Sequence, residues 1–171
     1  MLKIIPFDKT CIRKGFNCGK AELDEYLLKY AGQDIRRNLA ALFVAADDED
    51  RRIAGYYTLS NAGIVASILP SAFQKELGKY GDVPAIRLGR LAVDRRFQKR
   101  GLGERLLANA VIRSVSNSSA WAVMVVDAKD AAAAAFYRKF GFTSLKDDML
   151  HLFAPRTDLY HCLTAGARAG R

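Results

Sequence analysis

Two residue types that commonly build disulfide or metal sites are scarce in this chain. Among 171 residues there are only three cysteines and two histidines. The cysteines, Cys11, Cys18 and Cys162, are odd in number, and their spacing fits neither a CxxC motif nor a zinc-ligand pattern. Both histidines, His151 and His161, lie near the C-terminus. The sequence therefore predicts reduced thiols and no metal site.

Long apolar runs are also missing, although 50% of the residues are hydrophobic. No run reaches the roughly 18 residues that a membrane-spanning helix needs, and the first six residues do not have the pattern of a secretory signal. The apolar content is sufficient for the core of one domain. We expect a cytoplasmic protein without membrane contacts, with one domain over residues 1–155 and a weakly structured tail over residues 156–171.

Acidic residues are too few to balance the basic ones. The chain has 27 Lys and Arg against 18 Asp and Glu, so its formal net charge is +9. Such an excess favours an anionic partner, either a phosphate-rich ligand or a nucleic acid, and is silent on the fold.

The spacing of apolar residues predicts alternating helices and strands. Three- and four-residue steps predict helices at residues 20–38, 70–77, 101–116 and 131–140. Dense β-forming runs predict strands at 2–6, 39–46, 53–60, 83–93, 121–126, 142–145 and 149–153, and residues 62–69 can continue the third of these. Asp130 and Gly141 are the expected N-terminal cap and C-terminal end of the last helix. This alternation predicts an α/β fold with parallel strand pairing in the second half.

The most informative segment is residues 88–103, where a strand ends, a basic loop follows and a helix begins at Gly101-Leu102-Gly103. Residues 86–105 contain seven basic and two acidic side chains. A helix N-terminus offers unpaired N–H groups and partial positive charge, and glycine lets an anion approach the backbone closely. We interpret the segment as a cradle for a pyrophosphate group.

Several kinds of phosphate site can be compared with this segment. The GxxxxGK[ST] pattern of a P-loop is absent. A dinucleotide site would use Gly101 and Gly103, with Asp127 as the ribose-binding acid, but its third glycine is replaced by Leu106 and too little chain follows. The acyl-CoA pattern Q/R-x-x-G-x-G/A is matched in full by residues 98–103. The alternative is a glycine-rich helix start beside a solvated basic face.

A second motif follows about 35 residues later, as Ala135-Phe136-Tyr137-Arg138-Lys139-Phe140-Gly141-Phe142. With both motifs in this order and a β run between them, residues 40–153 resemble the GCN5-related N-acetyltransferase (GNAT) superfamily. The resemblance implies a single-domain α/β fold whose mixed, mostly antiparallel sheet is splayed at the centre and flanked by helices. It also implies acetyl-CoA as the cofactor.

The resemblance implies roles for particular residues. Tyr137 would act as the catalytic acid that protonates the leaving thiolate, although its alternative role is a core aromatic beside Phe136 and Phe140. The cofactor-binding residues would be Leu91, Ala92, Val93, Gln98, Lys99, Arg100, Gly101, Leu102, Gly103, Glu104, Asp127, Ala131 and Phe136.

No general base is evident on the strand at residues 83–93, where many lysine-modifying relatives have a glutamate. This strand carries Arg87 and Arg90, and no carboxylate precedes Asp94. An ordinary lysine is only about 0.04% neutral at pH 7, whereas an α-amine with a pKa near 7.7 is about 17% neutral. The missing base therefore favours an α-amine as the acetyl acceptor, unless ordered water relays the proton.

A narrower resemblance extends over residues 4–153. The phrases at residues 16–27, 31–37, 54–60 and 88–94 are similar to those of acetyltransferase toxins from bacterial type II toxin–antitoxin modules, which acetylate aminoacyl-tRNA and halt translation. This resemblance implies a ribbon–helix–helix antitoxin and a homodimer. The candidate tRNA-binding residues are Arg36, Arg37, Arg90, Arg95, Arg96 and Arg138.

Two other functions remain open from the sequence. The first is a GNAT enzyme that is not a toxin and acetylates a small amine, a protein N-terminus or a lysine. The second is a CoA-binding or RNA-binding module without turnover.

Overall fold

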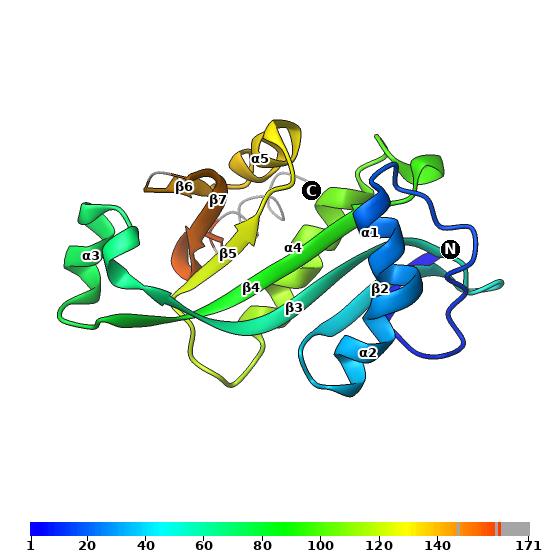
Figure 1. Cartoon of the computed structure of the whole chain (residues 1–171), viewed down its shortest axis with the longest axis horizontal. Helices are drawn as coiled ribbons and strands as arrows, with labels where there is room; N and C mark the ends of the chain where they lie inside the picture. Colours follow the sequence, from blue (N-terminus) through cyan, green and yellow to red (C-terminus); the bar gives the residue numbers. More distant parts are fainter. Residues whose placement is uncertain (147, 160, 162–171) are drawn as a thin grey trace. The chain divides into compact units, whose positions relative to one another are not determined.

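The computed structural model describes residues 1–146, 148–159 and 161, and its strands form one sheet (Figure 1). The strands are β1 (Leu2–Pro6), β2 (Ala41–Asp47), β3 (Ile53–Val65), β4 (Asp82–Val93), β5 (Val123–Asp127), β6 (Thr143–Leu145) and β7 (Asp148–Pro155). The sheet order is β1-β2-β3-β4-β5-β7-β6. The pairs β1–β2, β2–β3, β5–β7 and β6–β7 are antiparallel, whereas β4 and β5 are parallel. The predicted mixed α/β sheet is confirmed.

The parallel pair covers only part of β4. The register joins Ala85–Leu88 of β4 to Val123–Val126 of β5, and β4 then continues to Val93. The last part of β4 therefore extends beyond the residues that pair with β5.

The helices cover the predicted regions, with shorter bounds. They are α1 (Ala21–Glu25), the π-helix η1 (Tyr26–Tyr30), α2 (Ala31–Arg36), the 3-10 helix η2 (Ala66–Ile68), α3 (Ser71–Leu77), the 3-10 helix η3 (Arg95–Phe97), α4 (Leu102–Val115) and α5 (Ala131–Arg138). None of the helices within the described ranges is both long and apolar enough to cross a membrane.

The first predicted helix contains a π-helical segment in its middle. Arg13 donates hydrogen bonds to the carbonyl oxygens of Leu27 and Leu28, at 3.3 and 3.4 Å. Tyr26 donates its phenol proton to Asp34 Oδ2 at 3.0 Å, across eight residues. These side-chain bonds engage the backbone and the face of the helix where it widens, as is common at π-bulges.

The chain divides into two compact units, each with its own apolar core. Unit 1 comprises residues 1–60 and 89–110, and unit 2 comprises residues 61–88 and 111–171. The core of unit 1 gathers buried side chains from η1, β2 and β3, among them Leu27, Val44 and Tyr56. The core of unit 2 includes Leu69 and Val123. Strands β3 and β4 and helix α4 supply residues to both units.

Several predicted boundaries shift for identifiable reasons. The strand expected from Trp121 begins at Val123, because the buried Trp121 indole donates to the Ser114 carbonyl at 2.8 Å. The run at residues 62–69 is a strand only to Val65, and η2 follows. Within the predicted tail, residues 156–159 are helical and Leu159 is buried. Residues 160 and 162–171 of that tail, including Cys162, lie outside the described residues.

Helix α5 has the predicted cap at Asp130 and the predicted glycine ending at Gly141, although its last helical residue is Arg138 and not Phe140. The Asp130 side chain accepts a hydrogen bond from Ala133 N–H at 2.9 Å, which caps the first turn. Gly141 has a φ of 87°. The N–H groups of Gly141 and Phe142 donate to the carbonyls of Arg138 and Tyr137, and these two bonds form a Schellman ending.

Candidate active site

The predicted pyrophosphate cradle comprises the exposed turn between η3 and α4 and the first three residues of α4. We call residues 98–104 the glycine loop. Lys99 and Gly101 adopt positive φ angles of 59° and 75°. A Cβ atom added at Gly101 would meet no heavy atom within 4 Å, so the space in front of this residue is open. Lys99 and Arg100 are both exposed beside it.

The glycine loop has the chemistry that an anionic diphosphate requires. The first turn of any helix leaves N–H groups without an intrahelical partner. Among the described residues, no hydrogen bond engages the N–H groups of Gly101, Leu102 or Gly103. Leu102 is buried and anchors the start of α4. Free N–H groups, an open approach and two exposed cations together fit the pyrophosphate of CoA.

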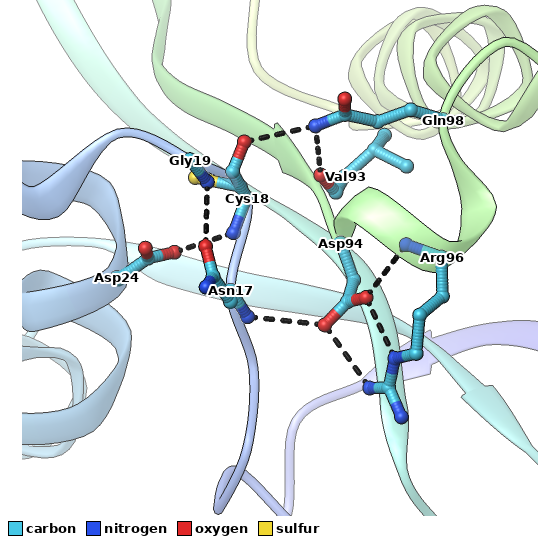
Figure 2. A network of polar contacts seen from close by, with 8 residues as sticks. All are labelled: Asn17, Cys18, Gly19, Asp24, Val93, Asp94, Arg96 and Gln98. Atoms are coloured by element: carbon cyan, nitrogen blue, oxygen red, sulfur yellow. Dashed lines mark hydrogen bonds and ion pairs between the residues drawn. The ribbon is translucent and has the colours of Figure 1, made fainter.

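Immediately before the loop, a buried carboxylate forms a network that the sequence did not predict (Figure 2). Asp94 is 1% exposed. Its carboxylate accepts from Asn17 N–H at 3.0 Å, from Arg96 N–H at 3.0 Å, and from Arg96 Nε and Nη2 at 2.8 and 3.0 Å. Burial alone pushes the pKa of Asp94 up, but the bonds from Arg96 and Asn17 and the Arg96 charge hold it below its usual value.

The Gln98 amide joins the glycine loop to a distant segment. Its Nε2 donates to the Cys18 carbonyl at 2.8 Å and to the Val93 carbonyl at 2.9 Å (Figure 2). Both amide protons are thereby used on backbone oxygens, so in this structure Gln98 holds the loop in place. The Cys18 thiol lies in the same segment, and burial, with a hydrogen bond to Asp24, raises its pKa to about 11.

Arg90, a predicted tRNA contact on β4, is held by an aromatic ring. Its guanidinium carbon lies 3.5 Å from the centroid of the Tyr26 ring, a cation–π contact. Burial and the hydrogen bond to Asp34 raise the pKa of Tyr26 to about 12, so the ring is a neutral phenol at pH 7. The sequence gave no signal for this pair, because 64 residues separate its members.

In unit 2, the predicted catalytic tyrosine lies in an aromatic cluster. Tyr137 is 6% exposed, and its ring centroid is 5.2 Å from that of Phe136 and 5.6 Å from that of Phe142. Within the described part of the chain, no hydrogen bond engages its hydroxyl. Burial raises the pKa of Tyr137 above its usual value. The ring therefore packs in the core, while the hydroxyl remains a protonated donor.

Asp127, a predicted cofactor residue, is ion-paired at the end of β5. Its Oδ2 lies 2.5 Å from Arg87 Nη1, and its Oδ1 lies 3.4 Å from His151 Nε2. Strand register places Asp127 directly opposite His151. Two further predicted cofactor residues, Ala131 and Phe136, lie at the first and sixth positions of α5.

The remaining candidate arginines differ in how free they are. Arg36 and Arg37 are exposed at the end of α2. Arg95 is exposed and lies close to Gly19, where an added Cβ would come within 2.8 Å of Arg95 Nε. Arg96 is exposed but paired with Asp94.

Arg138 is already hydrogen-bonded within unit 2. Its Nη2 donates to Ser144 Oγ at 2.9 Å and to the Met149 carbonyl at 3.0 Å.

The structure distributes the predicted residues over both units. Unit 1 contains the end of β4 (Leu91, Ala92 and Val93), the glycine loop, and Arg36, Arg37, Arg90, Arg95 and Arg96. Unit 2 contains Asp127, Ala131, Phe136, Tyr137 and Arg138.

The fold and the glycine loop define an acetyltransferase. Residues 38–144 match the family model described as an acetyltransferase (GNAT) domain. This match covers more than half of the chain, and the chain belongs to the GNAT acetyltransferase family.

Particular relatives are toxins. The chain is 35% identical over 139 residues to the tRNA-acetylating toxin of Mycobacterium tuberculosis, covering 80% of this chain and 81% of the relative. Among solved structures, a tyrosine-to-phenylalanine mutant of KacT has a TM-score of 0.87 at 28% identity, covering 94% of this chain and 98% of that one. AtaT complexed with acetyl-methionyl-tRNAfMet has a TM-score of 0.85 at 28% identity, with the same coverage.

Proposed function

We propose that this chain is an acetyl-CoA-dependent N-acetyltransferase toxin that acetylates the α-amine of aminoacyl-tRNA and thereby blocks translation. The observation that carries the proposal is the open, cationic glycine loop at the start of α4, in an acetyltransferase 35% identical to a tRNA-acetylating toxin. A neighbour with the same fold, AtaT, was solved with acetyl-methionyl-tRNAfMet. The net charge of +9 suits a polyanionic acceptor.

The contacts of acetyl-CoA are assigned separately within each unit. In unit 1, the N–H groups and cations of the glycine loop would bind the pyrophosphate, and the backbone of Leu91–Val93 would bind the pantetheine arm. In unit 2, Asp127, Ala131 and Phe136 are the assigned contacts. A related complex, AtaTR, was solved with acetyl-CoA bound. The bound group supplies an acetyl thioester, which an amine can attack.

Tyr137 is the proposed acid. As the amine nitrogen forms its bond to the acetyl carbon, the carbon–sulfur bond breaks, the phenol gives its proton to the sulfur, and the nitrogen releases its extra proton to water, which restores the phenol. A raised pKa keeps this phenol protonated at pH 7, and no internal acceptor among the described residues competes for its proton. Structures of tyrosine-to-phenylalanine mutants have been solved for both KacT and AtaT.

The acceptor would be an α-amine, because the end of β4 in unit 1, residues 89–93, carries no carboxylate that could act as a base. Arg87 pairs with Asp127 and Arg90 lies over Tyr26. A guanidinium is already protonated at pH 7, so neither arginine on β4 can take a proton from the amine. An α-amine with a pKa near 7.7 needs little help, since about 17% of it is neutral at pH 7. A lysine acceptor would need a base that this strand lacks.

The partners follow from the same assignment. AtaT was solved with the C-terminus of the antitoxin AtaR, and KacTA was solved with DNA. We expect a ribbon–helix–helix antitoxin that masks the active site, and a homodimer. The reaction would take place in the cytoplasm, where charged tRNAs are found.

The test is incubation of the purified protein with acetyl-CoA and a pool of charged tRNAs. RNase digestion followed by mass spectrometry should reveal N-acetyl-aminoacyl-adenosine and identify the preferred amino acid. Release of CoA thiol with a small amine or a peptide, but without this product, would overturn the tRNA assignment and favour the non-toxin alternative. Absence of turnover with every acceptor would overturn the enzymatic assignment.

A further inference from the structure

A short segment before α1 is tied to the base of the glycine loop from both sides. Asn17 N–H donates to Asp94, and the Asn17 carbonyl accepts from Arg95 N–H at 2.9 Å. The Cys18 carbonyl accepts from Gln98. These bonds join residues 17–19, here called the clasped segment, to residues 94–98.

The clasped segment leaves little room for independent movement. Gly19 has a φ of 87°, and a Cβ at this position would come within 2.8 Å of Arg95 Nε. Its N–H donates to Asn17 Oδ1 at 2.9 Å, which closes the segment on itself. A shift of Arg95 or Gln98 must therefore displace the segment or break these bonds.

The other end of the clasped segment leads into the first helix. Cys18 N–H donates to Asp24 Oδ1 at 2.8 Å, one helical turn into α1. The next turn is η1, which begins with the Tyr26 ring under Arg90. The clasped segment thus connects the glycine loop with the helical stretch that contains Tyr26, the ring under Arg90, and that ends at Arg36 and Arg37.

The positive charges of the glycine loop explain why an anionic ligand would strengthen its bonds to the clasped segment. Arg95, Arg96, Lys99 and Arg100 lie within six residues, and Asp94 is the neighbouring carboxylate that pairs with one of them. Their mutual repulsion favours an open arrangement of the loop, and a bound diphosphate removes it. A ligand that binds one arrangement better must shift the population toward it.

We propose that Asp94 and Gln98 are positioning residues that couple binding of CoA at the glycine loop to the order of the clasped segment and α1. CoA binding tightens the clasp, and the clasp aligns the acceptor-side helix. By linkage, an acceptor that binds this helix raises the affinity for acetyl-CoA by the same factor. The acceptor half of this inference rests on the proposed function, whereas the CoA half does not.

Hydrogen exchange followed by mass spectrometry tests the CoA half without any acceptor. Adding CoA to the full-length wild-type protein should slow amide exchange in peptides covering residues 17–24 by about tenfold. In Gln98→Met, which keeps the length of the side chain but removes both donors, the slowing should fall below about twofold. Because the coupling is reciprocal, the CoA dissociation constant measured by calorimetry should rise by about the same factor, about tenfold.

A matched control comes from unit 2. Gln74 Nε2 also bridges two backbone carbonyls, those of Ser67 and Leu69, at 3.2 and 2.6 Å. Gln74→Met removes the same kind of bond without touching the clasp. It should retain the full effect of CoA on residues 17–24.

Two results would overturn the proposal. Equal protection of residues 17–24 by CoA in wild type and Gln98→Met would show that the Gln98 hydrogen bonds do not couple CoA binding to the clasped segment. A rise in the CoA dissociation constant far beyond tenfold in Gln98→Met would show that Gln98 contacts the ligand itself.

The acceptor half has a separate readout. With charged tRNA, Gln98→Met should raise the KM of the acceptor by about tenfold with kcat nearly unchanged, because the coupling energy is lost from binding. If CoA protects residues 17–24 from exchange but charged tRNA gives no acetylated product, the CoA half of the proposal stands and aminoacyl-tRNA is rejected as the acceptor.

Discussion

Asp94 in unit 1 and Tyr137 in unit 2 are both buried and ionisable, yet their surroundings are opposite. Asp94 accepts hydrogen bonds from Asn17 and Arg96, and its pKa is lowered. Tyr137 lies among phenylalanine rings, and burial alone raises its pKa. The first environment stabilises a charge, and the second keeps a proton on its oxygen.

The two environments suit different roles, a structural one for Asp94 and the proposed acid role for Tyr137. A buried carboxylate with its donors satisfied can tie distant segments together, because breaking the arrangement leaves charge and N–H groups unpaired. A buried phenol without an internal acceptor gains nothing from its hydroxyl in the folded core. Its hydroxyl therefore remains free for the acid role that we propose.

The strongest test of this contrast is Tyr137→Phe. We expect kcat to fall by about 100-fold or more, the usual contribution of a positioned acid. Thermal stability should change little, because no hydrogen bond among the described residues uses the hydroxyl. Steady-state release of CoA thiol and a melting curve measure both effects.

The control for that variant is Tyr80→Phe, which removes the same hydroxyl from a side chain that is 75% exposed. It should retain full turnover. Full turnover in Tyr137→Phe as well would make the aromatic cluster purely structural.

A second test addresses the glycine loop. Gly101→Asp places a carboxylate beside the diphosphate, at a cost of about 3 kcal/mol, or roughly 100-fold in acetyl-CoA affinity. Calorimetry measures the dissociation constant. Gly78→Asp is a matched control, because Gly78 also has a positive φ, 70°, and open space around it. Unchanged affinity in Gly101→Asp would place the cradle elsewhere.

A third test concerns the buried carboxylate. Asp94→Asn should lower the free energy of unfolding by about 2 kcal/mol at pH 7, because an amide cannot accept every bond that the carboxylate accepts. The folded-state pKa of Asp94 is depressed, so its contribution is present above the unfolded pKa of about 3.9. It is lost as the pH falls through the folded value.

The wild-type advantage should therefore shrink with acidification when urea unfolding is followed at successive pH values. Asp82→Asn, on an exposed side chain, should show no such difference at any pH. A pH-independent gap between wild type and Asp94→Asn would contradict the assignment of the charge.

The smallest expected effect is on the salt dependence of tRNA binding, which we compare between arginines of the two units. Replacing Arg36 and Arg37 together by alanine should reduce the salt dependence of tRNA binding by about one to two units of slope, if each contacts a phosphate. Arg138→Ala should leave the slope nearly unchanged, since Arg138 is engaged by Ser144 and Met149. Titrations at several salt concentrations measure both slopes. A larger change for Arg138 would reverse this ranking.

The elements of the fold were largely predictable because their signals are local. Helix α5 has its cap at Asp130 and its Schellman ending at Gly141 within twelve residues of chain. The β2–β3 hairpin follows from two β-rich runs around an acidic turn. The π-helix at Tyr26–Tyr30 was not predictable, because Arg13 reaches it from outside the helix.

In the candidate site, too, the features with local signals were predictable and those with distant partners were not. Gly101 could be recognised because a helix start, a glycine and flanking cations are neighbours in sequence. Asp94 and Gln98 could not be assigned their partners, because Asn17 is 77 residues from the first and Cys18 is 80 residues from the second. Gln98 was predicted from the motif as a cofactor contact, and the structure adds its hydrogen bonds to the Cys18 and Val93 carbonyls.

The sequence by itself determined the class of fold, the glycine loop, the aromatic motif around Tyr137 and the excess of positive charge. These depend on residues within a turn or two of one another, where propensity and spacing suffice. Only the tertiary structure decided which groups are buried, which arginines are engaged and which distant segments are tied together. Burial and long-range pairing set the pKa of Asp94 and of Tyr137 in opposite directions, and no local pattern encodes either.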